Sequence, residues 1–133
     1  MSTLAFMSPA HVARMNELLA VDAASKAECA KLDRRWEMVY ELSDGARTVW
    51  WTMSFDPAHG VSFTLQPPRH TADILFRGEY KAMMQWMRRA KAGGQQGPEP
   101  VTQSGVADGM SVIAPAFHAA GKAATLETEV PVV

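Results

Sequence analysis

The chain has 133 residues, the usual size of one domain, and is long enough to bury a core. Its 13 Lys and Arg stand against 14 Asp and Glu, for a formal net charge of -1, so we do not expect nucleic acid as a partner. A single cysteine, Cys29, excludes an intramolecular disulfide and a Cys-rich zinc site. No apolar run approaches the roughly 20 residues that cross a bilayer, and the first residues lack a secretory signal pattern. We therefore expect a cytoplasmic protein without a membrane span.

The N-terminal part predicts helices. Ser8-Pro9 is a typical cap and first helical position, and apolar residues follow at helical spacing up to Leu19. Residues 25–28, Ser-Lys-Ala-Glu, have the form of a capping box, although Asp22 could also serve as the cap. We expect a second helix, or a kinked continuation of the first, that ends near residue 32 or 33.

The middle of the chain predicts a sheet. Residues 36–42, 47–55 and 61–65 each alternate between apolar and polar side chains, and Asp44-Gly45 is typical of a tight hairpin turn. These three segments predict an antiparallel meander. Pro67-Pro68 ends the third strand, and residues 72–76 predict a short fourth strand that runs directly into a helix.

The C-terminal part combines a helix, a loop, a weak strand and a second helix. Residues 78–91 predict an amphipathic helix, 92–100 a mobile loop and 101–106 a fifth strand. Residues 108–120 predict a last helix, which Pro115 must kink or delay. We expect the segment after about residue 122 to be a free tail. The fold class is α+β: one domain, residues 1–133, with an about five-stranded, largely antiparallel sheet covered by helices.

This order of elements resembles the sterol carrier protein type 2 family. The match covers roughly residues 35–91. Its most specific part is Ala72-Asp73 before an apolar strand and a helix that contains Glu79-Tyr80-Lys81-Ala82-Met83-Met84. This part follows the Asp-Gly hairpin and the Gly-Val strand at Gly60-Val61. The resemblance implies an apolar tunnel between sheet and helices that takes up fatty acyl groups, sterols or related lipids. The chain departs from the family after Lys91, where a strand rich in Gly and Lys and ending in Gly-Asp usually follows.

Large apolar side chains of the predicted sheet and helices are the candidate lining of such a cavity. The chain holds nine Met and four Trp, and Met suits surfaces that accept variable apolar shapes. The candidate ligand-binding residues are Trp51, Met53, Phe63, Phe76, Met83, Met84, Met87 and Phe117. Ordinary close packing explains the same residues equally well, because small domains use every large apolar side chain to build a core.

Few residues are candidates for metal binding or for catalysis. The four histidines are scattered and none forms the i, i+4 pair of a helical metal site, so we expect neither a metal nor another cofactor. Asp73 could have a raised pKa and act as a general base, but it could equally fix the turn before its strand through hydrogen bonds to backbone amides. His118 could orient a ligand or transfer a proton, or be a partly exposed helical residue.

Three functions therefore stay open at this point. The first is binding or transfer of a hydrophobic small molecule, fatty acyl, sterol-like or polyketide-like, in an apolar cavity. The second is a small metal-free isomerase, hydratase or cyclase that uses the same cavity, with Asp73 or His118 as acid and base groups. The third is an accessory module whose Met-rich helix docks on a larger enzyme; a homodimer is also open.

Overall fold

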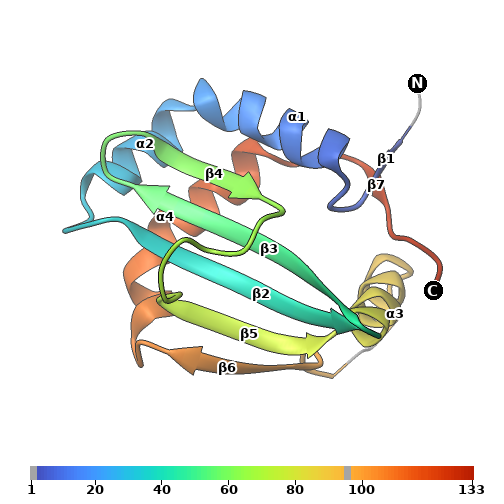
Figure 1. The fold of residues 1–133 in the computed structure, drawn as a ribbon. Coiled ribbons are helices and arrows are strands. Elements are labelled where there is room, and N and C mark those ends of the chain that lie inside the picture. Colours follow the sequence, from blue (N-terminus) through green and yellow to red (C-terminus); the bar gives the residue numbers. More distant parts are fainter. Residues whose placement is uncertain (1–2, 95–96) are drawn as a thin grey trace.

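The computed structural model describes residues 3–94 and 97–133. It contains a five-stranded sheet, a separate short pair of strands and four α-helices (Figure 1). In chain order the elements are β1 (Leu4–Ala5), α1 (Pro9–Ala20), α2 (Ala23–Ala30), β2 (Trp36–Asp44), β3 (Arg47–Asp56), β4 (Gly60–Thr64), β5 (Ile74–Glu79), α3 (Tyr80–Lys91), β6 (Val101–Gly105), α4 (Gly109–Ala123) and β7 (Thr128–Glu129). The α+β class expected from the sequence is confirmed.

The sheet has the strand order β4-β3-β2-β5-β6. Strands β2, β3 and β4 form the expected antiparallel meander, and the hairpin between β2 and β3 turns at Gly45, whose φ is +63°. Strand β5 then returns to the other side of β2 and pairs with it in parallel, while β6 pairs antiparallel to β5. Strand β2 is thus the centre of the sheet, and three of the four strand pairings in the sheet are antiparallel.

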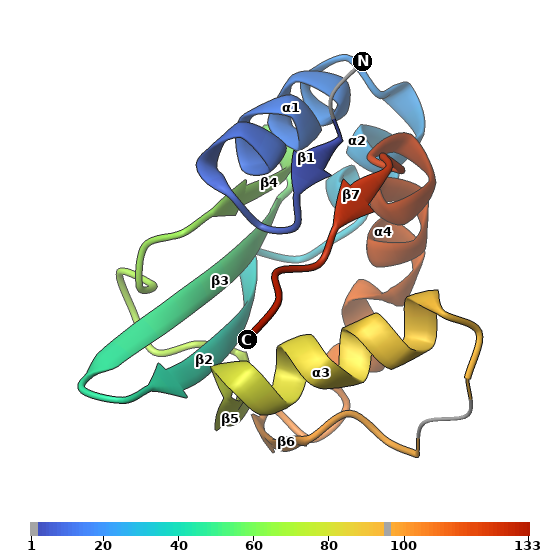
Figure 2. The same ribbon diagram turned by 90° about the vertical axis from the view of Figure 1, so that its right-hand side faces the viewer.

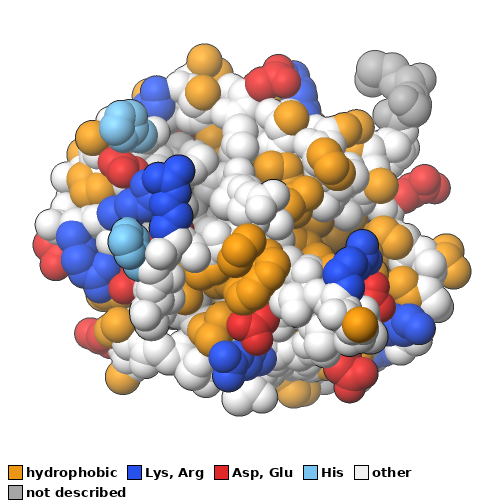
Figure 3. Space-filling model, viewed as in Figure 1, with side chains coloured by type: hydrophobic (Ala, Val, Ile, Leu, Met, Phe, Trp, Pro, Cys, Tyr) orange, Lys and Arg blue, Asp and Glu red, His pale blue; other side chains and the backbone are white. Residues whose placement is uncertain are grey.

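The two faces of the sheet have different covers. The inner face carries large apolar side chains, among them Met38, Met53 and Phe76, against the helices. The connection from β4 to β5 crosses the outer face (Figure 1), where Thr52 Oγ1 donates a 2.8 Å hydrogen bond to the carbonyl of Gln66. This crossing explains why Val39 is buried although it points away from the helices. Charged side chains surround apolar ones on this face (Figure 3).

Helices α1 and α2 begin at side-chain caps. Ser8 Oγ accepts a hydrogen bond from the backbone N–H of His11, and Pro9 is the first residue of α1, as the sequence predicts. Helix α2 uses Asp22 as its cap, through a 2.8 Å bond from the N–H of Ser25, so the alternative cap is the one adopted. Both helices pack on the meander side of the sheet, against β4.

Helices α3 and α4 complete the inner layer. Helix α3 follows β5 without a loop and buries Met83 and Met84. Helix α4 contains Pro115 and begins close to the sheet, since a Cβ on Gly109 would lie 2.8 Å from the Ile74 side chain. Among the described residues, no helix is both long and apolar enough to cross a membrane.

The C-terminal segment differs from the expected free tail. Strand β7 pairs in parallel with β1, and Val130 is buried beside α3. Arg88 donates a 3.2 Å hydrogen bond to the carbonyl of Val130, and the Lys91 ammonium donates to the carbonyl of Thr128. Figure 2 shows this segment running between α1 and α3. The free-tail expectation failed because apolar periodicity cannot detect a segment held by its backbone carbonyls.

Candidate functional site

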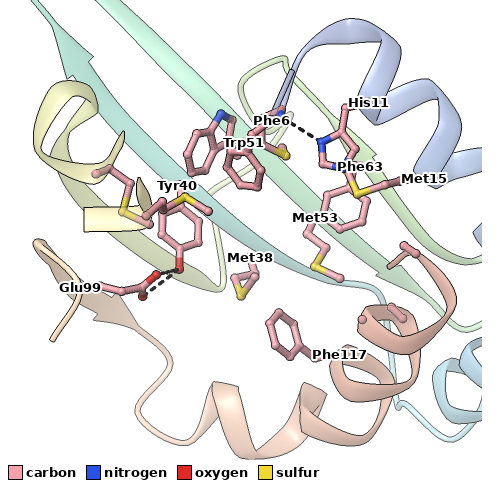
Figure 4. Close-up of a pocket in the computed structure, with 16 residues that line it drawn as sticks. Phe6, His11, Met15, Met38, Tyr40, Trp51, Met53, Phe63, Glu99 and Phe117 are labelled. Atoms are coloured by element: carbon pink, nitrogen blue, oxygen red, sulfur yellow. Dashed lines mark hydrogen bonds between the residues drawn. The ribbon is translucent and has the colours of Figure 1, made fainter. Parts of the chain in front are cut away.

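A largely apolar pocket of about 280 Å³ lies between the inner face of the sheet and the helices (Figure 4). It is lined by Phe6, Met7, His11, Met15, Met38, Tyr40, Trp51, Met53, Phe63, Met83, Met87, Glu99, Phe117, Ala120, Gly121 and Ala124. Segments from nearly the whole length of the chain contribute to it. The pocket therefore depends on the tertiary fold and on no single motif.

The sheet supplies one wall. Met38 and Tyr40 are two residues apart on β2, and Trp51 and Met53 are two residues apart on β3, so all four point to the same face. The strand register places Met38 opposite Met53 and Tyr40 opposite Trp51. Phe63 of β4, the register partner of Met53, extends this wall to the edge of the sheet. The alternation that defines the strands is thus the same property that gathers the pocket's large side chains.

Helices and the N-terminal turn supply the opposite wall. Met15 comes from α1, Met87 from α3 and Phe117 from α4, and small residues of α4, such as Ala120, leave room beside Phe117. Phe6 lies edge-on to Trp51, with ring centroids 5.4 Å apart. The flexible thioethers among these aromatic rings can adapt to apolar molecules of different shape.

A carboxylate and a phenol form one polar group in this pocket. The Tyr40 hydroxyl donates a hydrogen bond shared by the two carboxylate oxygens of Glu99, at 3.1 and 3.2 Å. Burial raises the pKa of Tyr40 well above its usual value, and the charge of Glu99 and the hydrogen bond to it raise this pKa further. Tyr40 therefore stays protonated and its hydroxyl remains a donor to Glu99.

His11 forms a second polar group, drawn well apart from Glu99 in Figure 4. Its Nδ1 atom accepts a 2.9 Å hydrogen bond from the backbone N–H of Met7. Burial lowers the pKa of His11, which favours the neutral ring that this bond requires. The remaining proton is then on Nε2. Every fully enclosed side-chain nitrogen in the described chain has a hydrogen-bond partner, and Nε2 has none there, so Nε2 is not fully enclosed.

The structure brings together most of the candidate ligand-binding residues. Those that line the pocket are Trp51, Met53, Phe63, Met83, Met87 and Phe117. Phe76 and Met84 do not line it. Phe76 is buried under Tyr40, with the rings stacked 4.7 Å apart, and Met84 is fully buried in the cluster that contains Leu42. That any of these residues binds a ligand stays a prediction.

Both candidate catalytic residues lie outside the pocket lining. Asp73 precedes β5, where one carboxylate oxygen accepts a 2.8 Å hydrogen bond from the backbone N–H of Glu37 and the other pairs with Arg34 at 3.0 Å. These bonds join the starts of β5 and β2, which agrees with the structural role considered for Asp73. His118 is exposed on α4, with its ring 6.0 Å from that of Phe117.

Sequence reasoning missed several residues of the lining. His11 could have been found, because it lies four residues before Met15 on the apolar face of a predicted helix. Glu99 could not, since it lies in a loop expected to be mobile and no periodicity places it. Within the described part of the chain, no group of three or more His, Cys, Asp or Glu side chains could hold a metal ion.

Comparisons with solved structures define the class of fold. The chain has a sterol-carrier-protein-like fold: it resembles the solution structure of a conserved hypothetical protein from Thermus thermophilus that was itself suggested to be a sterol carrier protein. The TM-score is 0.54 at 12% identity, over 93% of this chain and 90% of that one.

Further structures, two of which are sterol carrier proteins, were found at lower TM-scores. The crystal structure of sterol carrier protein 2 has a TM-score of 0.47 at 11% identity, covering 95% of this chain and 99% of that one. The apo form of Sterol Carrier Protein 2 from Yarrowia lipolytica has a TM-score of 0.44 at 15% identity, over 86% and 95% of the two chains. No protein-family model and no curated protein sequence matches the chain.

Proposed function

We propose that the protein binds a hydrophobic small molecule in the pocket between the sheet and the helices. The observation that carries this proposal is the pocket itself, an apolar space about 280 Å³ in volume inside a small domain. Interiors of small proteins are normally packed to the density of organic crystals, with few voids larger than a water molecule. A space of this size lined by aromatic rings and thioethers is what an apolar ligand would fill.

The size of the pocket limits the ligand. Small-molecule pockets commonly enclose about 300–1,000 Å³, so this pocket of about 280 Å³ is just below that range. We therefore favour a single acyl chain or a compact ring system over a lipid with two chains. Fatty acyl, sterol-like and polyketide-like skeletons all remain candidates at this level. The free energy of binding would come chiefly from apolar area removed from water, at about 25 cal/mol per Å² before binding costs.

The experiment that tests this proposal has two parts. Native mass spectrometry of the purified protein detects any retained molecule, and titration with the uncharged dye Nile red tests whether an apolar molecule binds at one site. We expect a saturable rise in dye fluorescence that dodecanol reverses by competition. Absence of both a retained molecule and saturable dye binding would overturn the proposal.

Transfer between membranes is the finer part of the same proposal. A carrier must release its ligand as well as bind it, so the protein should speed the movement of a fluorescent apolar probe from donor to acceptor vesicles. The cytoplasmic location, an enzymatic use of the pocket, and docking on a partner enzyme or a second copy of the chain stay predictions from the sequence.

A further inference from the structure

Among its described residues, the pocket lining contains one acidic side chain and no Lys or Arg to balance it. The acidic side chain is that of Glu99. Within the described chain, no cation forms an ion pair with the Glu99 carboxylate. Its neighbours in the pocket are apolar except for Tyr40. A half-buried negative charge in apolar surroundings favours ligand groups that donate hydrogen bonds to it.

The Glu99 carboxylate has acceptor capacity to spare. Tyr40 has one hydroxyl proton, which the two carboxylate oxygens share. A carboxylate offers about four lone-pair sites, so the others remain for a ligand. The bond from Tyr40 also fixes the position of the carboxylate, so a ligand donor would meet a preorganised acceptor.

The opposite polar group does not reverse this preference. His11 presents one neutral N–H donor, and the side chain is almost fully buried, at 5% exposure. Burial lowers the pKa of this ring, so the ring carries no positive charge to pair with an anion. A ligand carboxylate would therefore meet a negative charge near Glu99, or a single neutral donor near His11, and would lose most of its hydration in either place.

We propose that Glu99, held by Tyr40, makes the pocket selective for uncharged molecules that end in a hydroxyl group over carboxylates of the same skeleton. This inference rests on the proposed function, because it concerns the ligand of the same pocket. The hydroxyl donates to Glu99 while the apolar skeleton lies against Met38, Met53 and Phe117. A free fatty acid is a poor ligand, and the corresponding alcohol is a good one.

The test compares two ligands that differ in one group. Dodecanol and dodecanoate are each used to displace Nile red at about pH 8, where a free carboxylic acid is ionised. The variants are Glu99→Gln, which keeps size and an acceptor oxygen for Tyr40, and Glu127→Gln, which removes a negative charge from an exposed residue outside the pocket lining. Thermal unfolding followed by circular dichroism establishes that each variant is folded.

We expect the wild-type protein and Glu127→Gln to prefer dodecanol. In Glu99→Gln the ratio of the two affinities should fall by about tenfold, chiefly because dodecanoate binds more tightly once the like charge is gone. An unchanged ratio with both ligands bound would overturn the role of Glu99 and leave the proposed function intact. Failure of both ligands and of the dye to bind wild-type protein would instead overturn the proposed function.

Should Glu99→Gln not fold, Glu99→Ala supplies the same comparison without the bond to Tyr40. A second readout is the salt dependence of dodecanoate binding. Repulsion by Glu99 predicts that added salt strengthens dodecanoate binding to the wild-type protein and has a smaller effect in the variant. Equal salt dependence in both proteins would contradict the inference.

Discussion

His11 and Met7 are joined by a 2.9 Å hydrogen bond from the Met7 backbone N–H to the imidazole Nδ1 atom. Met7 has a φ of +54°, in the left-handed region that a residue with a side chain seldom adopts. The bond helps to hold this conformation, and with it the turn that places Phe6 and Met7 in the pocket wall. Only an unprotonated Nδ1 can accept it, so this wall depends on a neutral His11.

Stability should therefore depend on pH through His11. Burial puts the pKa of the folded-state ring below its ordinary value of 6.5, so the unfolded chain binds more protons between these two values. The stabilisation from neutral His11 is complete above about pH 6.5 and is lost as the pH falls toward the folded-state pKa. Urea unfolding measured above and below pH 6.5 gives the free energy of unfolding at each pH. This free energy should decrease less at the lower pH in His11→Gln than in wild type. His70→Gln, at an exposed loop position, should keep the wild-type decrease.

Filling the pocket should weaken binding without unfolding the protein. Met38→Trp enlarges a side chain that projects from β2 into the pocket, and we expect Nile red affinity to fall by about tenfold or more. Leu75→Trp makes a similar enlargement at a half-buried residue on the neighbouring strand, outside the pocket lining. It should bind the dye as wild type does. Equal affinity in Met38→Trp and wild type would place the dye elsewhere.

The sheet was predictable from the sequence because its signals are local. Alternation along residues 36–42 and 47–55 and the Asp44-Gly45 turn fixed the hairpin register, and that register brings Tyr40 beside Trp51. The pocket lining was predictable in part for the same reason: Trp51, Met53 and Phe63 are on the apolar face of predicted strands.

What the sequence did not reveal depends on contacts between distant segments. Glu99 reaches Tyr40 across 59 residues, and no spacing rule links a loop carboxylate to a strand phenol. The C-terminal segment is held through its carbonyls by Arg88 and Lys91, side chains that sequence reasoning could equally assign to a solvated helix face. Phe76 and Met84 were expected in the lining, but packing encloses them, and periodicity cannot separate a core residue from a pocket residue.

Asp73 should prove structural. Asp73→Ala removes the acceptor for the Glu37 N–H and the partner of Arg34, and we expect a loss of about 1–3 kcal/mol in the free energy of unfolding. Asp73→Asn keeps an acceptor oxygen, so its loss should be smaller. Denaturation in urea measures both values. Wild-type stability combined with lost ligand binding or turnover would contradict this role.

The packing of the C-terminal segment can be tested by shortening two valine side chains to alanine. Val130 is 7% exposed against α3, whereas Val132 is 81% exposed. Val130→Ala should lower the free energy of unfolding by about 1–3 kcal/mol, because it removes buried methyl groups, and Val132→Ala should change it by less than about 0.5 kcal/mol. Equal, small effects in urea unfolding would mean that the segment does not pack as described.

Binding of an apolar molecule between the sheet and the helices can be observed residue by residue. Amide NMR spectra recorded during titration with dodecanol test it most directly, because each chemical shift reports on a named residue. We expect saturable shifts concentrated at pocket residues such as His11, Tyr40 and Phe117, with little change at Leu75 on the outer face. An unchanged spectrum, or shifts confined to the outer face, would contradict it.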